Sequence, residues 1–165
     1  SDVCSSDLSE EQAKSRIDAL REQFGDDIYT KTKWEGRQTD WLIQWFAKFV
    51  NSGQAGVSIP VTFTIGGNLV SGYLISEAAY FEQLANDFAG ALPEVAQEAG
   101  KELIKALQPT LATDEDDQPA CQFAHLKSAQ VFTGASQPVP STGTLWRGKI
   151  SSVEGFSLGS LSVGK

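Results

Sequence analysis

The residue types that perform most acid–base and nucleophilic chemistry are scarce in this chain. His125 is its one histidine, and Cys4 and Cys121 are its two cysteines. Along an extended segment Cys121 and His125 would be roughly 13 Å apart, too far for direct contact. No G-x-S-x-G pattern surrounds a serine, so a serine–histidine site has no support. We therefore expect His125 to be a structural or surface residue, and we expect the protein not to be an enzyme.

Metal and cofactor sites also lack their usual residues. One histidine and no paired cysteines provide too few ligands for a transition metal. The acidic block DEDD at 114–117 lacks the glycine turn and the distant glutamate of a calcium-binding loop. Neither G-x-x-x-x-G-K-[ST] nor G-x-G-x-x-G occurs, so phosphate binding is not indicated. We expect no cofactor and no specific metal site.

One candidate for contact with a partner is the run Trp146-Arg147-Gly148-Lys149. In a strand, Arg147 and Lys149 share one face and Trp146 lies on the other. The pair could form a basic strip that touches an anionic surface. The alternative is a core tryptophan accompanied by two solvated charges.

A second candidate is the apolar run WLIQWFAKFV at 41–50. At helical spacing it forms a broad stripe that includes Trp41, Trp45 and Phe49. The stripe could dock on a partner or enter a membrane interface, or it could belong to a core helix. Lys48 alone is too little positive charge for anionic lipid, and the core helix is the ordinary interpretation.

The net charge of −8 disfavours nucleic acid and anionic lipid as partners. The charge is unevenly distributed. The chain after the acidic block contains one acidic residue, Glu154, and four basic residues, so its net charge is +3. The basic residues are Lys127, Arg147, Lys149 and Lys165. An acidic linker beside a basic end permits electrostatic self-association, although solubility alone also explains such a linker.

A chain of 165 residues fits one domain with tails. No apolar run approaches the ~20 residues that span a bilayer. The polar, acidic start has no signal-peptide layout, so a cytoplasmic location is expected. Residues 1–8, SDVCSSDL, resemble a translated sequencing adapter. We expect an N-terminal extension over 1–38 and one domain over 39–165 that contains a flexible acidic linker at 109–120.

Local patterns predict the order of elements. A capping box at Ser9 begins an amphipathic helix over 10–24, and Thr39 or Asp40 begins a helix over 40–51. Alternation predicts a strand over 57–65, and Gly66-Gly67-Asn68 predicts a hairpin that leads into LVSGYLI, with a bend or bulge at Gly72.

The second half of the chain is predicted to contain two helices and three strands. The helices span 77–91, which begins after Ser76, and 94–107, which begins after Pro93. The apolar stripe of the second helix is Val95, Ala99, Leu103 and Leu107. Strands follow over 123–133, 144–152 and 155–163, with a tight turn at Glu154-Gly155 between the last two. The fold class is therefore α+β: a small, strongly bent antiparallel sheet of five strands with N-terminal helices and a helical insert between strands two and three. An SH3- or Sm-like barrel is one form that such a sheet takes.

Three blocks of sequence resemble the gas vesicle accessory protein U family. They are DWLIQWFAKFVN at 40–51, VSIPVTFTIGGNLVSGYLISEAAYFEQLA at 57–85, and the stretch 123–161, which contains FAHLKSAQVF, LWRGKI and EGFSLGSL. Together they cover about half of the chain. The helix at 10–24 and the insert at 93–120 depart from the family pattern.

The resemblance implies a non-enzymatic bacterial helper of gas vesicle assembly or clustering, which binds vesicle components or itself and has no catalytic residues. The expected partner contacts are Trp41, Trp45, Phe49, Arg147 and Lys149. An alternative is an Sm-like nucleic-acid-binding or general protein-interaction module, since IGGNLVSGYL is loosely similar to an Sm-type strand–loop–strand. The net charge of −8 argues against the nucleic-acid role.

Overall fold

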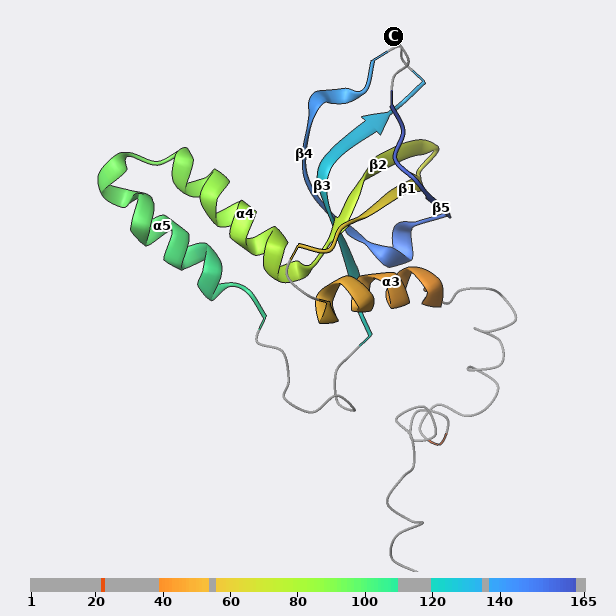
Figure 1. Ribbon diagram of the computed structural model, residues 1–165, viewed down its shortest axis with the longest axis horizontal. Coiled ribbons are helices and arrows are strands. Elements are labelled where there is room, and N and C mark those ends of the chain that lie inside the picture. Colours follow the sequence, from red (N-terminus) through yellow and green to blue (C-terminus); the bar gives the residue numbers. More distant parts are fainter. Residues whose placement is uncertain (1–21, 23–38, 54–55, 110–119, 135–136, 163–165) are drawn as a thin grey trace, which may run out of the picture. The chain divides into compact units, whose positions relative to one another are not determined.

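The computed structural model of the protein describes residues 22, 39–53, 56–109, 120–134 and 137–162. The chain divides into the units Ser1–Gln38 and Thr39–Lys165, and the elements below belong to the second (Figure 1). Apart from residue 22, the predicted helix at 10–24 lies outside the described residues, as do residues 1–8 and the acidic block at 114–117. No described helix is long and apolar enough to cross a bilayer.

Helix α3 spans Trp41–Ser52, as its apolar spacing predicts. Asp40 is the N-cap, and its carboxylate accepts a hydrogen bond of 2.8 Å from the amide of Leu42. The face that carries Ile43, Ala47 and Val50 is buried. This face attaches the helix to the sheet.

Strands β1 (Ile59–Ile65) and β2 (Asn68–Ile75) form the predicted hairpin. Gly66 and Gly67 have φ values of +56° and +78°, as a two-residue turn with two positive φ angles requires. The bulge predicted at Gly72 is confirmed, because the pairing of β2 with β3 shifts register between Ser71 and Tyr73. A Cβ at Gly72 would lie 3.0 Å from the backbone of Ala129.

Helices α4 (Glu77–Gly90) and α5 (Glu94–Ala106) form the helical insert between β2 and β3. The hydroxyl of Ser76 caps α4 by accepting from the amide of Ala79 at 3.1 Å, and Pro93 is the N-cap of α5. The two helices lie side by side as a hairpin in Figure 1. Helix α4 contacts strands β3 and β4, while α5 packs chiefly against α4.

The last three strands differ from their predicted bounds. Strand β3 spans Phe123–Phe132, β4 spans Val139–Lys149 and β5 spans Gly155–Leu158. Residues 139–143, which lie outside the predicted strands, are therefore part of β4. The tight turn predicted at Glu154-Gly155 is wrong: the 3₁₀ helix η2 (Ile150–Ser152) leads out of β4, and its Ile150 is buried in the core.

The sheet is antiparallel and open, with the order β4-β3-β2-β1-β5. The α+β class, the five strands and the helical insert are confirmed. The barrel is wrong, because β4 and β5 are the two edges of the sheet. Burial of Ile150 takes the chain away from β4, and β5 then pairs with β1 over only four residues. A strand this short, at the far edge, leaves the edge of β4 unpaired within the described chain.

One face of the sheet packs against α3 and forms the main core. Phe63, Leu74 and Leu126 are its largest strand residues, and each is at most 1% exposed. Trp146 is partly buried and packs against this core, with its ring centroid 6.1 Å from that of Phe63. The interpretation of Trp146 as a core tryptophan is thus supported by the ring contact.

The other face is covered in part by the segment after β5. Thr62 and Ser71 are paired across β1 and β2, both are buried, and their hydroxyl oxygens are 3.0 Å apart. The Thr62 hydroxyl lies 2.8 Å from the carbonyl oxygen of Gly159, and the amide of Leu161 donates to the Ser71 hydroxyl at 2.7 Å. These four groups form a hydrogen-bonded chain that holds residues 159–161 across the two strands.

Candidate functional site

Helix α3 carries an exposed row of aromatic side chains, which we call the aromatic stripe: Trp41, Trp45 and Phe49. Their exposed fractions are 74%, 52% and 45%. A spacing of four places the three on one side of the helix, away from the buried Ile43 and Ala47. The rings of Trp45 and Phe49 are stacked, with centroids 5.4 Å apart and planes 15° apart. Large apolar side chains gathered on an exposed helix face are typical of a contact surface.

Side-chain hydrogen bonds fix the position of α3 beneath this stripe. The amide of Gln44 donates to the carbonyl oxygen of Cys121 at 3.0 Å. The side-chain carbonyl of Asn51 accepts from the backbone amide of Glu77, the first residue of α4, at 2.7 Å. The helix is therefore tied both to the start of β3 and to α4. A rigid helix lowers the entropy cost of binding through its outer face.

The sequence left open whether the 41–50 run is a core helix or a contact surface. In the structure the two alternatives apply to opposite faces of one helix. Phe46 turns toward the core and lies 5.5 Å from the ring of Phe156, whereas Trp45, its neighbour, is half exposed. The spacing showed one broad stripe, and only packing against the sheet divides it.

Arg147 and Lys149 lie on the sheet face opposite α3. Arg147 pairs with His125 across β3 and β4, while the core residues Leu126 and Trp146 form the next pair along. Alternation therefore places Arg147 and the aromatic stripe on different sides of the sheet. The structure does not bring the two predicted groups of contact residues together. Lys149, the last residue of β4, is exposed.

The guanidinium of Arg147 contacts several groups within the protein. Its Nη1 atom is 2.9 Å from Nε2 of His125 and 3.6 Å from a carboxylate oxygen of Glu77. Its guanidinium also lies 4.1 Å from the ring centroid of Phe123, a cation–π distance. Since Glu77 begins α4, this arginine attaches α4 to strands β3 and β4.

His125 is a buried residue of strand β3. It is 3% exposed, and the ring of Tyr80 lies 4.6 Å from its own. Burial, and then the positive charge of Arg147, lower the pKa of His125 from 6.5 to about 4. The ring is thus neutral at pH 7, with Nε2 accepting from the arginine. No nucleophile contacts it among the interactions of the described residues.

Cys121 is a free, half-buried thiol. Burial is the main cause that raises its pKa. The amide of Asn51 approaches its sulfur at 3.8 Å. A protonated, partly covered thiol is a weak nucleophile. Within the described residues no group of three or more potential ligands could hold a metal ion.

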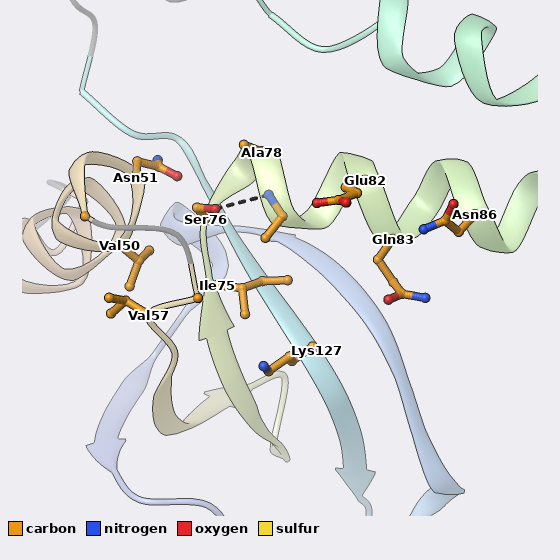
Figure 2. A pocket seen from close by; sticks show the side chains of 13 residues that line it. Val50, Asn51, Val57, Ile75, Ser76, Ala78, Glu82, Gln83, Asn86 and Lys127 are labelled. Carbon is orange, nitrogen blue, oxygen red and sulfur yellow. Dashed lines mark hydrogen bonds between the residues drawn. The ribbon is translucent and has the colours of Figure 1, made fainter.

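A groove of about 580 Å³ lies between the end of α3, the end of β2 and α4. Figure 2 shows Glu82, Gln83 and Asn86 extending from α4, and Lys127 on the strand below. Val50, Val57 and Ile75 form apolar parts of its lining, and the Ser76 hydroxyl is used to cap α4. Among the described residues of the lining, Glu82 and Lys127 are charged, and none is a histidine or a cysteine. The sequence did not predict this groove because its walls come from segments distant in the chain, and its described lining residues form no catalytic constellation.

Comparison with known proteins gives one match. A family model described as "Gas vesicle protein GvpU-like" matches residues 40–161. This range begins at the N-cap of α3 and includes every helix and strand described above. No curated protein matches the chain, and no solved structure does.

Proposed function

Because the chain belongs to the GvpU-like gas vesicle protein family, we propose that it is a non-enzymatic accessory protein of gas vesicle assembly or clustering. It acts by binding vesicle components, or further copies of itself, through the aromatic stripe of α3. The observation that carries this proposal is the exposure of Trp41, Trp45 and Phe49 on a helix whose opposite face is fixed in the core.

The chemistry of the stripe suits an apolar partner. Gas vesicle walls are built from a small hydrophobic shell protein, so an apolar contact is the natural means of recognising them. Aromatic side chains dominate the energetics of protein interfaces, because each buries a large area at a low cost in conformational entropy. The stacked rings of Trp45 and Phe49 already restrict each other, which reduces that cost further.

Electrostatic association is a secondary contribution. The acidic block at 114–117 and the net charge of +3 after it permit contacts between copies. Such contacts weaken as salt rises, since the Debye length falls to ~3 Å at 1 M. An apolar contact through the stripe persists under the same conditions. Salt dependence therefore separates the two contributions.

The test is flotation of purified gas vesicles from the source organism with added protein. The Trp45→Ala/Phe49→Ala variant should stay in solution, while wild type should float with the vesicles at both low and high salt. Tyr73→Ala is the matched control, because Tyr73 is an exposed aromatic residue of strand β2 outside the stripe. A variant with 114–117 changed to serine should lose only the salt-sensitive part of binding.

Two results would count against the proposal. Equal flotation of wild type and the stripe variant would remove α3 as the contact. Vesicles that form and cluster identically with and without the protein would overturn the accessory role itself.

A further inference from the structure

Helix α5 repeats a pattern of four residues, and three of its four positions have one environment each. Glu94, Glu98 and Glu102 are exposed acidic residues. The residues that follow them, Val95, Ala99 and Leu103, are exposed as well, with Val95 at 97% and Leu103 at 58%. The next ones along, Ala96, Gly100 and Ile104, are partly or fully buried. Three parallel rows therefore run along the helix: acidic, exposed apolar and packed.

The predicted apolar stripe of this helix is not the row that packs against α4. The sequence indicated Val95, Ala99, Leu103 and Leu107 as its apolar stripe, and we call these four the α5 stripe. The row that contains Gly100 packs against α4 instead, because the missing side chain of Gly100 lets α4 approach closely. A Cβ at Gly100 would lie 2.5 Å from a methyl group of Leu92 and 3.4 Å from the ring of Phe88. The packed row therefore faces α4, and the α5 stripe faces outward, with Leu107 63% exposed.

We propose that the α5 stripe is a second docking surface, and that it binds an amphipathic helix of a partner protein with lysine or arginine beside its apolar face. The apolar row of the partner would lie along Val95, Ala99 and Leu103, where the small Ala99 makes room between two larger side chains. A helix that packs its apolar face onto such a surface is a recurring mode of recognition. This surface is separate from the aromatic stripe, and the proposal does not depend on the proposed function.

The negative charge of the α4–α5 segment favours a basic partner helix over a second copy of the chain or an anionic lipid surface. The acidic row flanks the stripe from Val95 to Leu103, so basic residues beside the partner's apolar face would be attracted to it. The segment from α4 to α5, 77–106, holds six acidic and two basic residues, a net charge of −4. Two copies of this acidic hairpin would repel each other, and an anionic lipid surface would repel the hairpin as well. The Glu102–Lys105 pair, 3.7 Å apart and largely exposed, neutralises little of the row.

The probe is a labelled peptide of about 15 residues, long enough to run along α5. It carries leucine and alanine at a spacing of four, with lysine on both sides of that row. A second peptide has glutamate in place of every lysine, and a third has the lysine peptide's composition in scrambled order. Binding to the full chain is measured by fluorescence anisotropy, and the methyl NMR signals of Val95 and Leu103 locate the contact.

The expected result is saturable binding of the lysine peptide, shifts of those two methyl signals, and much weaker binding of both other peptides. The Val95→Gln/Leu103→Gln variant should weaken binding at least about tenfold, since two apolar contacts are lost. The control is Leu158→Gln, because Leu158 of β5 is as exposed, at 62%, as Leu103. That variant should bind as wild type does, and so should Trp45→Ala.

Three results would overturn the proposal. Equal binding of the scrambled peptide would show attraction to bulk charge alone. Equal weakening by Leu158→Gln would show that the α5 stripe is not the site. Self-association that Val95→Gln/Leu103→Gln abolishes, in a chain that does not bind the lysine peptide, would identify a second copy as the occupant.

Discussion

Arg147 donates a hydrogen bond of 2.9 Å to Nε2 of His125, its partner across strands β3 and β4. The arginine also lies 3.6 Å from Glu77 of α4, and the histidine ring contacts Tyr80 of the same helix. The docking of α4 on the sheet therefore depends on a neutral imidazole. An imidazolium has no lone pair with which to accept, and its charge would repel the guanidinium.

This arrangement predicts a pH dependence of stability. The pKa of His125 is about 4 in the folded chain and 6.5 in its ordinary state. Between these values the unfolded chain binds a proton that the folded chain does not, so the free energy of unfolding falls as pH drops from 6.5 to 4. A pKa difference of this size corresponds to roughly 3 kcal/mol. Below pH 4 the histidine adds no further loss.

Urea unfolding of wild type and His125→Gln between pH 4 and pH 7 measures this contribution. Glutamine keeps an acceptor for Arg147 but does not titrate, and both proteins share all other ionisable groups. The wild-type curve should be the steeper one. Parallel curves for the two proteins would show that His125 is not held neutral by the fold.

Gly148 is predicted to tolerate no side chain, because the indole of Trp146 covers it. A Cβ at Gly148 would overlap the ring. We expect Gly148→Ala to destabilise the protein by about 1–3 kcal/mol. The same change made on a Trp146→Ala background should cost much less, so a double-mutant cycle isolates the contact. Gly90→Ala at the end of α4 is the control, since a Cβ there would meet no atom within 4 Å beyond the adjoining backbone of the helix, and it should be neutral or stabilising.

The two faces of α3 should respond differently to truncation. Ile43 is 1% exposed, so Ile43→Ala should cost about 2–4 kcal/mol of unfolding free energy. Trp45 is half exposed, and Trp45→Ala should cost less than about 1 kcal/mol. Circular dichroism during urea unfolding gives both values without relying on tryptophan fluorescence. A large loss in Trp45→Ala would mean that the aromatic stripe is covered within the protein.

The hydroxyl of Thr62 is predicted to hold the segment after β5. Thr62→Val keeps the side-chain shape but removes the donor to Gly159 and leaves the Ser71 hydroxyl with one partner fewer. We expect a loss of about 1–2 kcal/mol and faster hydrogen exchange at the amide of Leu161. Thr64→Val, on the same strand but outside this hydrogen-bonded chain, is the control. Unchanged exchange at Leu161 would contradict the role given to the network.

The sequence by itself determined the elements whose signals are local. Asp40, Ser76 and Pro93 begin helices as expected, and Gly66-Gly67 makes the hairpin turn. Caps and turns depend on the conformations of a few neighbouring residues, so single positions reveal them. The order of elements followed from the same local patterns, whereas the family resemblance was carried by the three blocks at 40–51, 57–85 and 123–161.

Only the tertiary structure decided which apolar row of each helix is buried and how the sheet ends. Periodicity identifies apolar rows, but the row that packs is the one whose shape fits a distant partner. In α5 the row that contains Gly100 packs against α4, because the missing side chain leaves space for Leu92 and Phe88. In α3 packing against the sheet buries one side of the broad apolar stripe and leaves Trp41, Trp45 and Phe49 exposed. Burial of Ile150 likewise sends β5 to the edge beside β1 and leaves the sheet open. Each outcome depends on close packing between residues far apart in the chain, which no local pattern records.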